Sequence, residues 1–171
     1  MVRVQAAHKL KRRQYYAGGP NQVWASDGHD KLMPYGIGIY GFIDCWSRKL
    51  LGLHAHVTNS DPRHVDLWYL ELVKKHGGIP QKLTTDRGTE TIDLAGHQMY
   101  FGQQCGTQTP GFQYHRYVPS TSNTKIESAW EKMQNSVTGH LKDEIAQRIA
   151  DGDYDPDDPM QRWVCDLYFV E

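Results

Sequence analysis

The succession of three β-favouring runs, one helical segment and a fourth β-favouring run limits the fold most strongly. The first three runs, residues 23–27, 35–44 and 50–57, follow one another across short turns. This succession predicts an antiparallel meander. The helical segment and the fourth run, residues 82–85, make a strand–helix–strand unit. A crossover of this kind places the fourth strand parallel to a neighbouring strand.

Helix signals separate and follow these strands. A cap candidate precedes Pro62, and Gly77–Gly78 ends an apolar face of period three to four. Residues 89–101 are expected to be helical, with Ile92, Ala95 and Met99 facing inward. The alternation of residues 112–118 predicts a fifth strand. From Thr124 a long amphipathic helix is predicted on one face by Ile126, Trp130, Met133, Val137, Leu141, Ile145 and Ile149.

These elements predict one α/β domain. A chain of 171 residues can bury one core but scarcely two. We expect a five-stranded mixed sheet, with strands one to three antiparallel and strands four and five parallel, flanked by helices. Residues 1–20 form a basic arm, residues 21–150 the core, and residues 151–171 an acidic linker and the start of a truncated helix.

Charge and cysteine content exclude several classes of protein. The net charge is -1, and no apolar run is long enough for a membrane span or a signal peptide, so a soluble intracellular protein is expected. Cys45, Cys105 and Cys165 form no C-x-x-C pair and are expected to be reduced thiols. The basic run at residues 8–13 is either a solvated tail, a phosphate contact or a nuclear address.

Three acids stand at element boundaries: Asp27 after the first strand, Asp86 after the fourth, and Glu127 in the first turn of the long helix. If the first and fourth strands are neighbours, the two aspartates lie next to each other. Two divalent cations held by such carboxylates can activate the attacking oxygen and stabilise the leaving oxygen of a phosphodiester. Each acid also has a structural explanation: the aspartates suit turns, and Thr124 to Glu127 fits a capping box.

The residues around these acids carry more information than their spacing. In order, they read VWASDGHDKLMPYGIGIYGFIDCWSRKLLGL, NSDPRHV, GGIPQKLTTDRGTE and PSTSNTKIESAWEKM. From Gln22 to the end, the chain resembles the integrase catalytic core of retroelements and related transposases, in particular the cores of eukaryotic transposable elements. Four blocks in this order are far more specific than any single acid.

The resemblance implies a ribonuclease H-like fold with Asp27, Asp86 and Glu127 as the catalytic, metal-binding triad. It implies two Mg²⁺ or Mn²⁺ ions and no small-molecule cofactor. The expected reaction trims DNA 3′ ends by water attack and joins the new 3′-hydroxyl to target DNA, without a covalent enzyme intermediate. DNA is the expected partner, together with a possible homo-oligomer, and the nucleus is the expected location. No membrane partner is expected.

Other residues in the matching blocks receive more local assignments. Asn123 and Lys125 flank the predicted site and are expected to contact DNA phosphates. Asp44 and Arg48 are interpreted as a structural pair at a hairpin turn, and Glu90 and Asp93 are interpreted as solvated.

Departures from the family leave other functions open. The 40 residues between Asp86 and Glu127 exceed the 35 typical of retroviral relatives, and the chain contains no upstream zinc module. A domesticated or decayed core that binds DNA or protein without catalysis is one alternative. A plain ribonuclease H-like nuclease is another.

Overall fold

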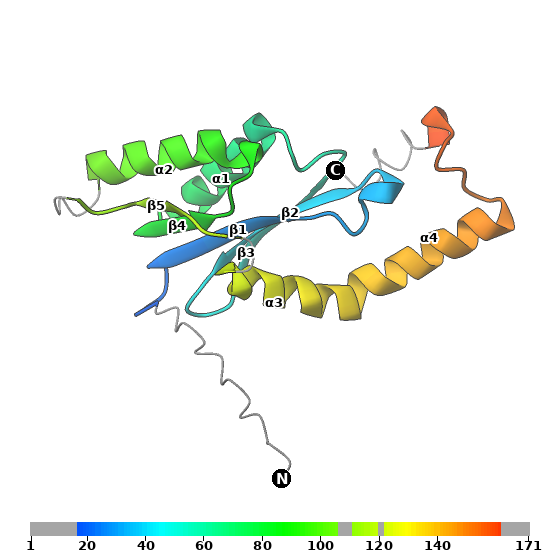
Figure 1. The fold of residues 1–171 in the computed structure, drawn as a ribbon, viewed down its shortest axis with the longest axis horizontal. Coiled ribbons are helices and arrows are strands. Elements are labelled where there is room, and N and C mark those ends of the chain that lie inside the picture. The colour runs from blue at the N-terminus through cyan, green and yellow to red at the C-terminus, as the bar shows by residue number, and fades with distance from the viewer. Residues whose placement is uncertain (1–16, 106–110, 120–121, 162–171) are drawn as a thin grey trace, which may run out of the picture.

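A five-stranded sheet forms the centre of the molecule (Figure 1). The computed structural model describes residues 17–105, 111–119 and 122–161. The strand order is β3-β2-β1-β4-β5. The bounds are Val23–His29 for β1, Gly38–Asp44 for β2, Leu50–His56 for β3, Lys82–Thr85 for β4 and His115–Tyr117 for β5.

The direction of each strand confirms the predicted meander and crossover. β1 pairs antiparallel with β2, and β2 pairs antiparallel with β3. β4 runs parallel to β1 on its other side, and β5 runs parallel to β4. This mixed order is the ribonuclease H-like arrangement, so the expected fold class is confirmed.

Helices cover both faces of the sheet (Figure 1). On one face lie α1 (Pro62–His76) and α2 (Ile92–Cys105), and on the other lies α3 (Thr124–Met133). The first core cluster contains the strand residues Trp24, Tyr40, Phe42, Leu51 and Leu83 with Val65, Trp68, Tyr69, Leu72 and Leu94 from the helices. The second contains Val23, Ala25, Leu32, Ile37, Ile39, Ile43, Cys45, Ile126 and Trp130. Alternation along the strands thus builds two separate cores.

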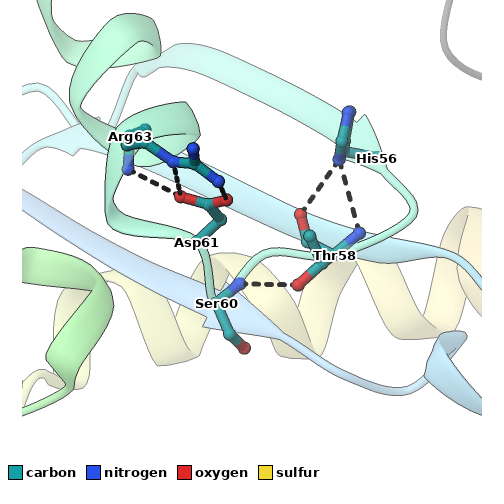
Figure 2. Close-up of polar contacts among 5 residues, drawn as sticks. All are labelled: His56, Thr58, Ser60, Asp61 and Arg63. Carbon is teal, nitrogen blue, oxygen red and sulfur yellow. Dashed lines mark hydrogen bonds and ion pairs between the residues drawn. The ribbon is translucent and has the colours of Figure 1, made fainter.

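The start and end of α1 follow the capping signals in the sequence. Asp61 is the N-cap, and its Oδ1 accepts a hydrogen bond from the Arg63 backbone N–H at 2.9 Å. Figure 2 shows this contact together with the preceding turn, in which the Ser60 N–H donates to Thr58 Oγ1 at 3.2 Å. Gly77 ends the helix in the left-handed conformation, with φ of 71°. Both boundaries agree with the predicted helix.

The inward face of α2 differs from the prediction. Ala95 is buried as expected, but Ile92 and Met99 are 57% and 48% exposed. The buried positions are Leu94, Ala95, Gln98 and Gly102. Gln98 is fully buried because its Nε2 donates to Pro80 O at 3.0 Å and Tyr114 O at 3.1 Å, while Tyr69 Oη donates to its Oε1. Apolar periodicity does not predict this buried face of α2, because an amide side chain lies at its centre.

Two glycines in α2 allow a matched stability prediction. An added Cβ at Gly102 would lie 2.2 Å from Tyr114 Cγ, whereas one at Gly96 would meet nothing within 4 Å. We expect Gly102→Ala to destabilise the protein by about 1–3 kcal/mol through overpacking. Gly96→Ala should stabilise it by roughly 0.5–1 kcal/mol through helix propensity. Urea denaturation checks both variants, and a change of the same sign in both would contradict the packing described.

The predicted long helix is interrupted by a π-helical segment, Gln134–Thr138, before α4 (Gly139–Asp151). The Gly139 N–H donates to Gln134 O, five residues earlier. The wider turn shifts the helical phase, so Val137 is 60% exposed and Thr138 is buried in its place. The prediction that Val137 faces inward is therefore wrong, while Ile126, Trp130 and Ile145 are buried as expected.

Smaller differences concern strand boundaries. Residues 33–35 form a 3₁₀ turn, so β2 begins at Gly38, and β5 is shorter than the predicted residues 112–118.

Within the described ranges, no helix has both the length and the apolar character needed to cross a membrane. Cys45 is buried and Cys105 is exposed, both as free thiols.

Some expectations fall on residues that the structure does not describe. The basic run at residues 8–13, Cys165 and most of the expected C-terminal helix lie outside the described residues. The division into an arm, a core and an acidic linker stays a prediction.

Candidate active site

Asp27 lies inside β1 rather than at its end. β1 continues to His29, where the sequence suggested a turn at Gly28, so the predicted end of the strand is wrong. Asp27 is the fifth residue of the strand and pairs with Gly41 of β2. It is half-buried on the sheet face that α3 covers, and its Oδ2 accepts a hydrogen bond from the Trp130 indole N–H at 3.1 Å.

Asp86 follows β4 directly and is in register with Asp27. Val23 pairs with Lys82 and Ala25 with Thr84, an offset of 59 positions (82 − 23), and the same offset leads from Asp27 to Asp86 (86 − 27). Equivalent positions on neighbouring strands lie about 4.8 Å apart and present their side chains to the same face. The register thus places these two carboxylates at the point where β4 ends beside β1.

The turn after Asp86 is fixed by a buried threonine. Thr91 Oγ1 donates to Gly88 O at 2.8 Å and lies 3.5 Å from Asp86 O. Thr85 Oγ1 also donates to Asp86 O, at 2.9 Å. These bonds satisfy the turn carbonyls and hold the backbone that carries Asp86.

Glu127 is brought to the same region by the start of α3. The buried Asn123 donates from Nδ2 to Ser26 O at 3.1 Å, and Ser26 immediately precedes Asp27. The Glu127 N–H donates to Asn123 O, and α3 begins at Thr124 without a side-chain cap. The capping-box interpretation of Thr124 and Glu127 is therefore wrong. The Glu127 side chain is exposed beside the sheet.

The electrostatics of Asp27 record how close these acids lie. The pKa of Asp27 is raised to about 7, mainly by burial; the Trp130 hydrogen bond opposes the shift, and the negative charges of Asp86 and Glu127 add to it. Glu90 also interacts electrostatically with Asp86, since burial and the charges of Asp86 and Asp30 raise the pKa of Glu90. A carboxylate whose pKa is raised in this way has too little positive charge around it to stabilise its ionised form.

The donor atoms suit a hard divalent cation. Carboxylate oxygens are the ligands that Mg²⁺ prefers, and a bound cation would stabilise the ionised form of Asp27, which burial and the charges of Asp86 and Glu127 disfavour. In the described ranges, no three His, Cys, Asp or Glu side chains already stand close enough to hold an ion together. The donor chemistry of Asp27, Asp86 and Glu127 therefore fits such a cation, and Glu127 is the exposed member of the three.

The remaining sequence candidates take varied places. Asn123 is 4% exposed, and its amide is used in the bond to Ser26, so it anchors α3. Lys125 lies close enough to Cys45 to act on the pKa of that thiol, which burial raises to about 12. DNA contact by Asn123 or Lys125 stays a prediction.

Two further pairs of candidates are resolved locally. Asp44 is buried, and its carboxylate accepts hydrogen bonds from the backbone N–H groups of Ser47 and Asn21. The backbone N–H of Arg48 donates to the Asp44 carbonyl oxygen at 2.9 Å. The turn role of Asp44 is therefore clear. Glu90 is half-buried beside Asp86, so the interpretation of Glu90 as solvated is wrong. Asp93 is exposed, as expected.

Sequence reasoning missed Trp130 and Gly41 as neighbours of Asp27. Trp130 was interpreted only as a core residue, and its spacing from Ile126 supports that interpretation. A buried indole N–H needs a hydrogen-bond acceptor, and this need could have pointed to a polar group beside Trp130. Gly41 gave no signal, because the indole of Trp130, which occupies the place of a side chain at position 41, comes from a distant helix.

The order and direction of the five strands define a ribonuclease H-like fold. The integrase core domain family matches residues 14–171. The chain belongs to this family.

Solved structures add two similar chains. The HTLV-2 integrase catalytic core domain in complex with magnesium, in its trimeric form, is 16% identical, with a TM-score of 0.49 over 72% of this chain and 74% of that one. A chain of the simian T-cell lymphotropic virus intasome in complex with the PP2A regulatory subunit B56 gamma is 14% identical, with a TM-score of 0.48 over 72% of this chain and 42% of that one. No curated protein matches the chain.

Proposed function

We propose that this chain is the catalytic core of an integrase that processes DNA 3′ ends and transfers them to target DNA with divalent metal ions. The observation that carries the proposal is the register of β1 and β4, which sets Asp27 beside Asp86. The Asn123 bond to Ser26 brings the helix of Glu127 to the same place. Membership of the integrase core domain family supports the choice of reaction.

In this proposal Asp27, Asp86 and Glu127 hold two Mg²⁺ or Mn²⁺ ions. When bound, the ions supply Lewis acidity and activate the attacking hydroxyl or water. The carboxylates themselves bind and orient, and none acts as a nucleophile. In the first reaction water breaks a phosphodiester bond and leaves a 3′-hydroxyl. In the second reaction that hydroxyl attacks a target phosphodiester, so one bond forms as another breaks.

DNA must reach the site where β4 ends beside β1 from the solvent. Glu127 is exposed, and Lys125 lies two residues before it in the first turn of α3. A lysine there can contact a phosphate and help to fix the register of the duplex without reading its sequence. We also propose that the active form is a homo-oligomer, because joining an end to target DNA requires two DNA segments to be held together.

A core that binds DNA without catalysis is a second candidate. It is favoured by one observation: no three potential ligands among the described side chains are already close enough to share a metal ion. Calorimetry with Mg²⁺ and Mn²⁺ separates the two functions. An active core binds these ions through its triad carboxylates, whereas an inactive core shows no binding that depends on Asp86.

The activity itself is tested with the purified chain and labelled DNA. We expect Mn²⁺-dependent nicking of a linear DNA end and resolution of a branched DNA that mimics the joined product. An RNA–DNA hybrid of the same sequence serves as the comparison. Cleavage of the hybrid alone would indicate a ribonuclease H-like nuclease instead. A folded sample that processes no DNA with either metal would refute the proposed enzyme.

A further inference from the structure

We propose that Trp130 is a positioning residue whose indole N–H fixes the orientation of the Asp27 carboxylate. The inference rests on the proposed function, because it assigns a role within the same site. The indole Nε1 lies 3.1 Å from Asp27 Oδ2, and the Trp130 side chain is 6% exposed. The two residues are 103 positions apart, so only the packing of α3 on the sheet brings them together.

The sheet provides the space for this indole directly opposite Asp27. Gly41 is the β2 residue paired with Asp27, and side chains at paired positions share one face of the sheet. An added Cβ at Gly41 would lie 2.4 Å from Trp130 Cη2. The indole therefore occupies the place that a side chain at position 41 would need. Glycine is required there for close approach and not for backbone conformation.

The indole also contacts His29. Its ring stacks on Trp130 with centroids 5.0 Å apart and an interplanar angle of 23°. Gln134, the first residue of the π-helical segment, lies near enough to act on His29. π-helical turns are frequent at functional sites. Buried, against Gly41 and stacked with His29, the indole has little freedom to rotate away from Asp27.

An indole N–H only donates, so it bonds best to an ionised carboxylate. Held in one place, it restricts the directions in which the Asp27 oxygens can point. Groups that orient a metal-binding side chain through a hydrogen bond typically change metal affinity by about 10–100-fold. A tryptophan serving only as core packing would have no such effect, because phenylalanine could replace its contacts with Gly41 and His29.

The first experiment needs no metal and no activity. In ¹⁵N-labelled full-length chain, the indole N–H signal of Trp130 is assigned by its loss in Trp130→Phe. At one fixed pH we expect this signal to shift in Asp27→Ala, which removes the acceptor, and to keep its wild-type position in Asp93→Asn, which changes an exposed carboxylate elsewhere. A Trp130 signal that is the same in the wild type and in Asp27→Ala overturns the inference, whatever the chain does to DNA.

The second experiment measures Mg²⁺ and Mn²⁺ affinity by calorimetry. We expect Trp130→Phe to weaken binding about tenfold. Gly41→Ala, which displaces the indole and changes no ligand, should weaken binding in the same direction. Trp68→Phe is the matched control, since Trp68 packs in the core on the opposite face of the sheet and should leave affinity unchanged.

The outcomes separate the two proposals. Wild-type affinity in a folded Trp130→Phe variant overturns the positioning role. Absence of metal binding by the wild type overturns the proposed function, and the indole N–H comparison then still decides whether Trp130 donates to Asp27. If Trp130→Phe does not fold, the metal affinity of Gly41→Ala and the shift of an indole signal in Asp27→Ala decide the inference.

Discussion

Asp86→Asn is expected to reduce metal-dependent DNA nicking and joining on the order of a thousandfold or more, with the fold intact. Asp86 stands in register with Asp27 at the end of β4, where its charge acts on Asp27. An amide removes one negative charge and one hard oxygen ligand from the proposed site. The backbone of the turn is held by Thr85 and Thr91 through the Asp86 carbonyl, which the substitution keeps. Labelled-DNA assays at fixed Mn²⁺ measure the loss.

Asp93→Asn is the matched control for this variant. Asp93 lies in the first turn of α2, is exposed, and makes the same change of charge when replaced. Its activity should stay within about twofold of the wild type. Thermal denaturation of both variants shows whether each is folded. Equal losses of activity in the two variants would indicate an effect of net charge on DNA binding, and would contradict the site assigned to Asp86.

Asp27→Asn is expected to stabilise the metal-free protein at pH 8. The pKa of Asp27 is raised from 3.8 to about 7, mainly by burial. A raised folded-state pKa means that the folded chain holds its proton more tightly than the unfolded chain. Stability is therefore greatest below the unfolded pKa of 3.8 and is lost as the pH rises towards 7. Since one pKa unit is about 1.4 kcal/mol, the loss by pH 8 is on the order of 4 kcal/mol.

Asparagine carries no charge, so the variant escapes this loss. Urea denaturation at pH 4 and at pH 8 in the presence of a chelator measures the difference between wild type and variant. We expect the variant to gain stability relative to the wild type between the two pH values. Added Mg²⁺ should stabilise the wild type and not the variant. A difference that is the same at both pH values would show that the Asp27 carboxylate is not strained by its surroundings.

Most of the fold followed from local signals in the sequence. The strand runs, the Pro62 helix start and the Gly77 stop are determined by residues within a few positions of each other. The errors lie where burial depends on distant partners. Gln98 is buried because Pro80, Tyr69 and Tyr114 satisfy its amide. Val137 turns outward because the π-helical segment shifts the phase of the helix.

The sequence by itself predicted the antiparallel meander, the parallel direction of the fourth and fifth strands and the three candidate acids, but not which strand the fourth one pairs with. These follow from hydrophobic periodicity and from the direction that a crossover gives to a strand. Only the tertiary structure decided that Asp27 meets the indole of Trp130, across from a glycine at position 41. The reason is physical: a contact between a strand and a helix 103 residues apart depends on how the two surfaces pack, and periodicity specifies which face of a helix is buried but not which atom of the sheet it reaches.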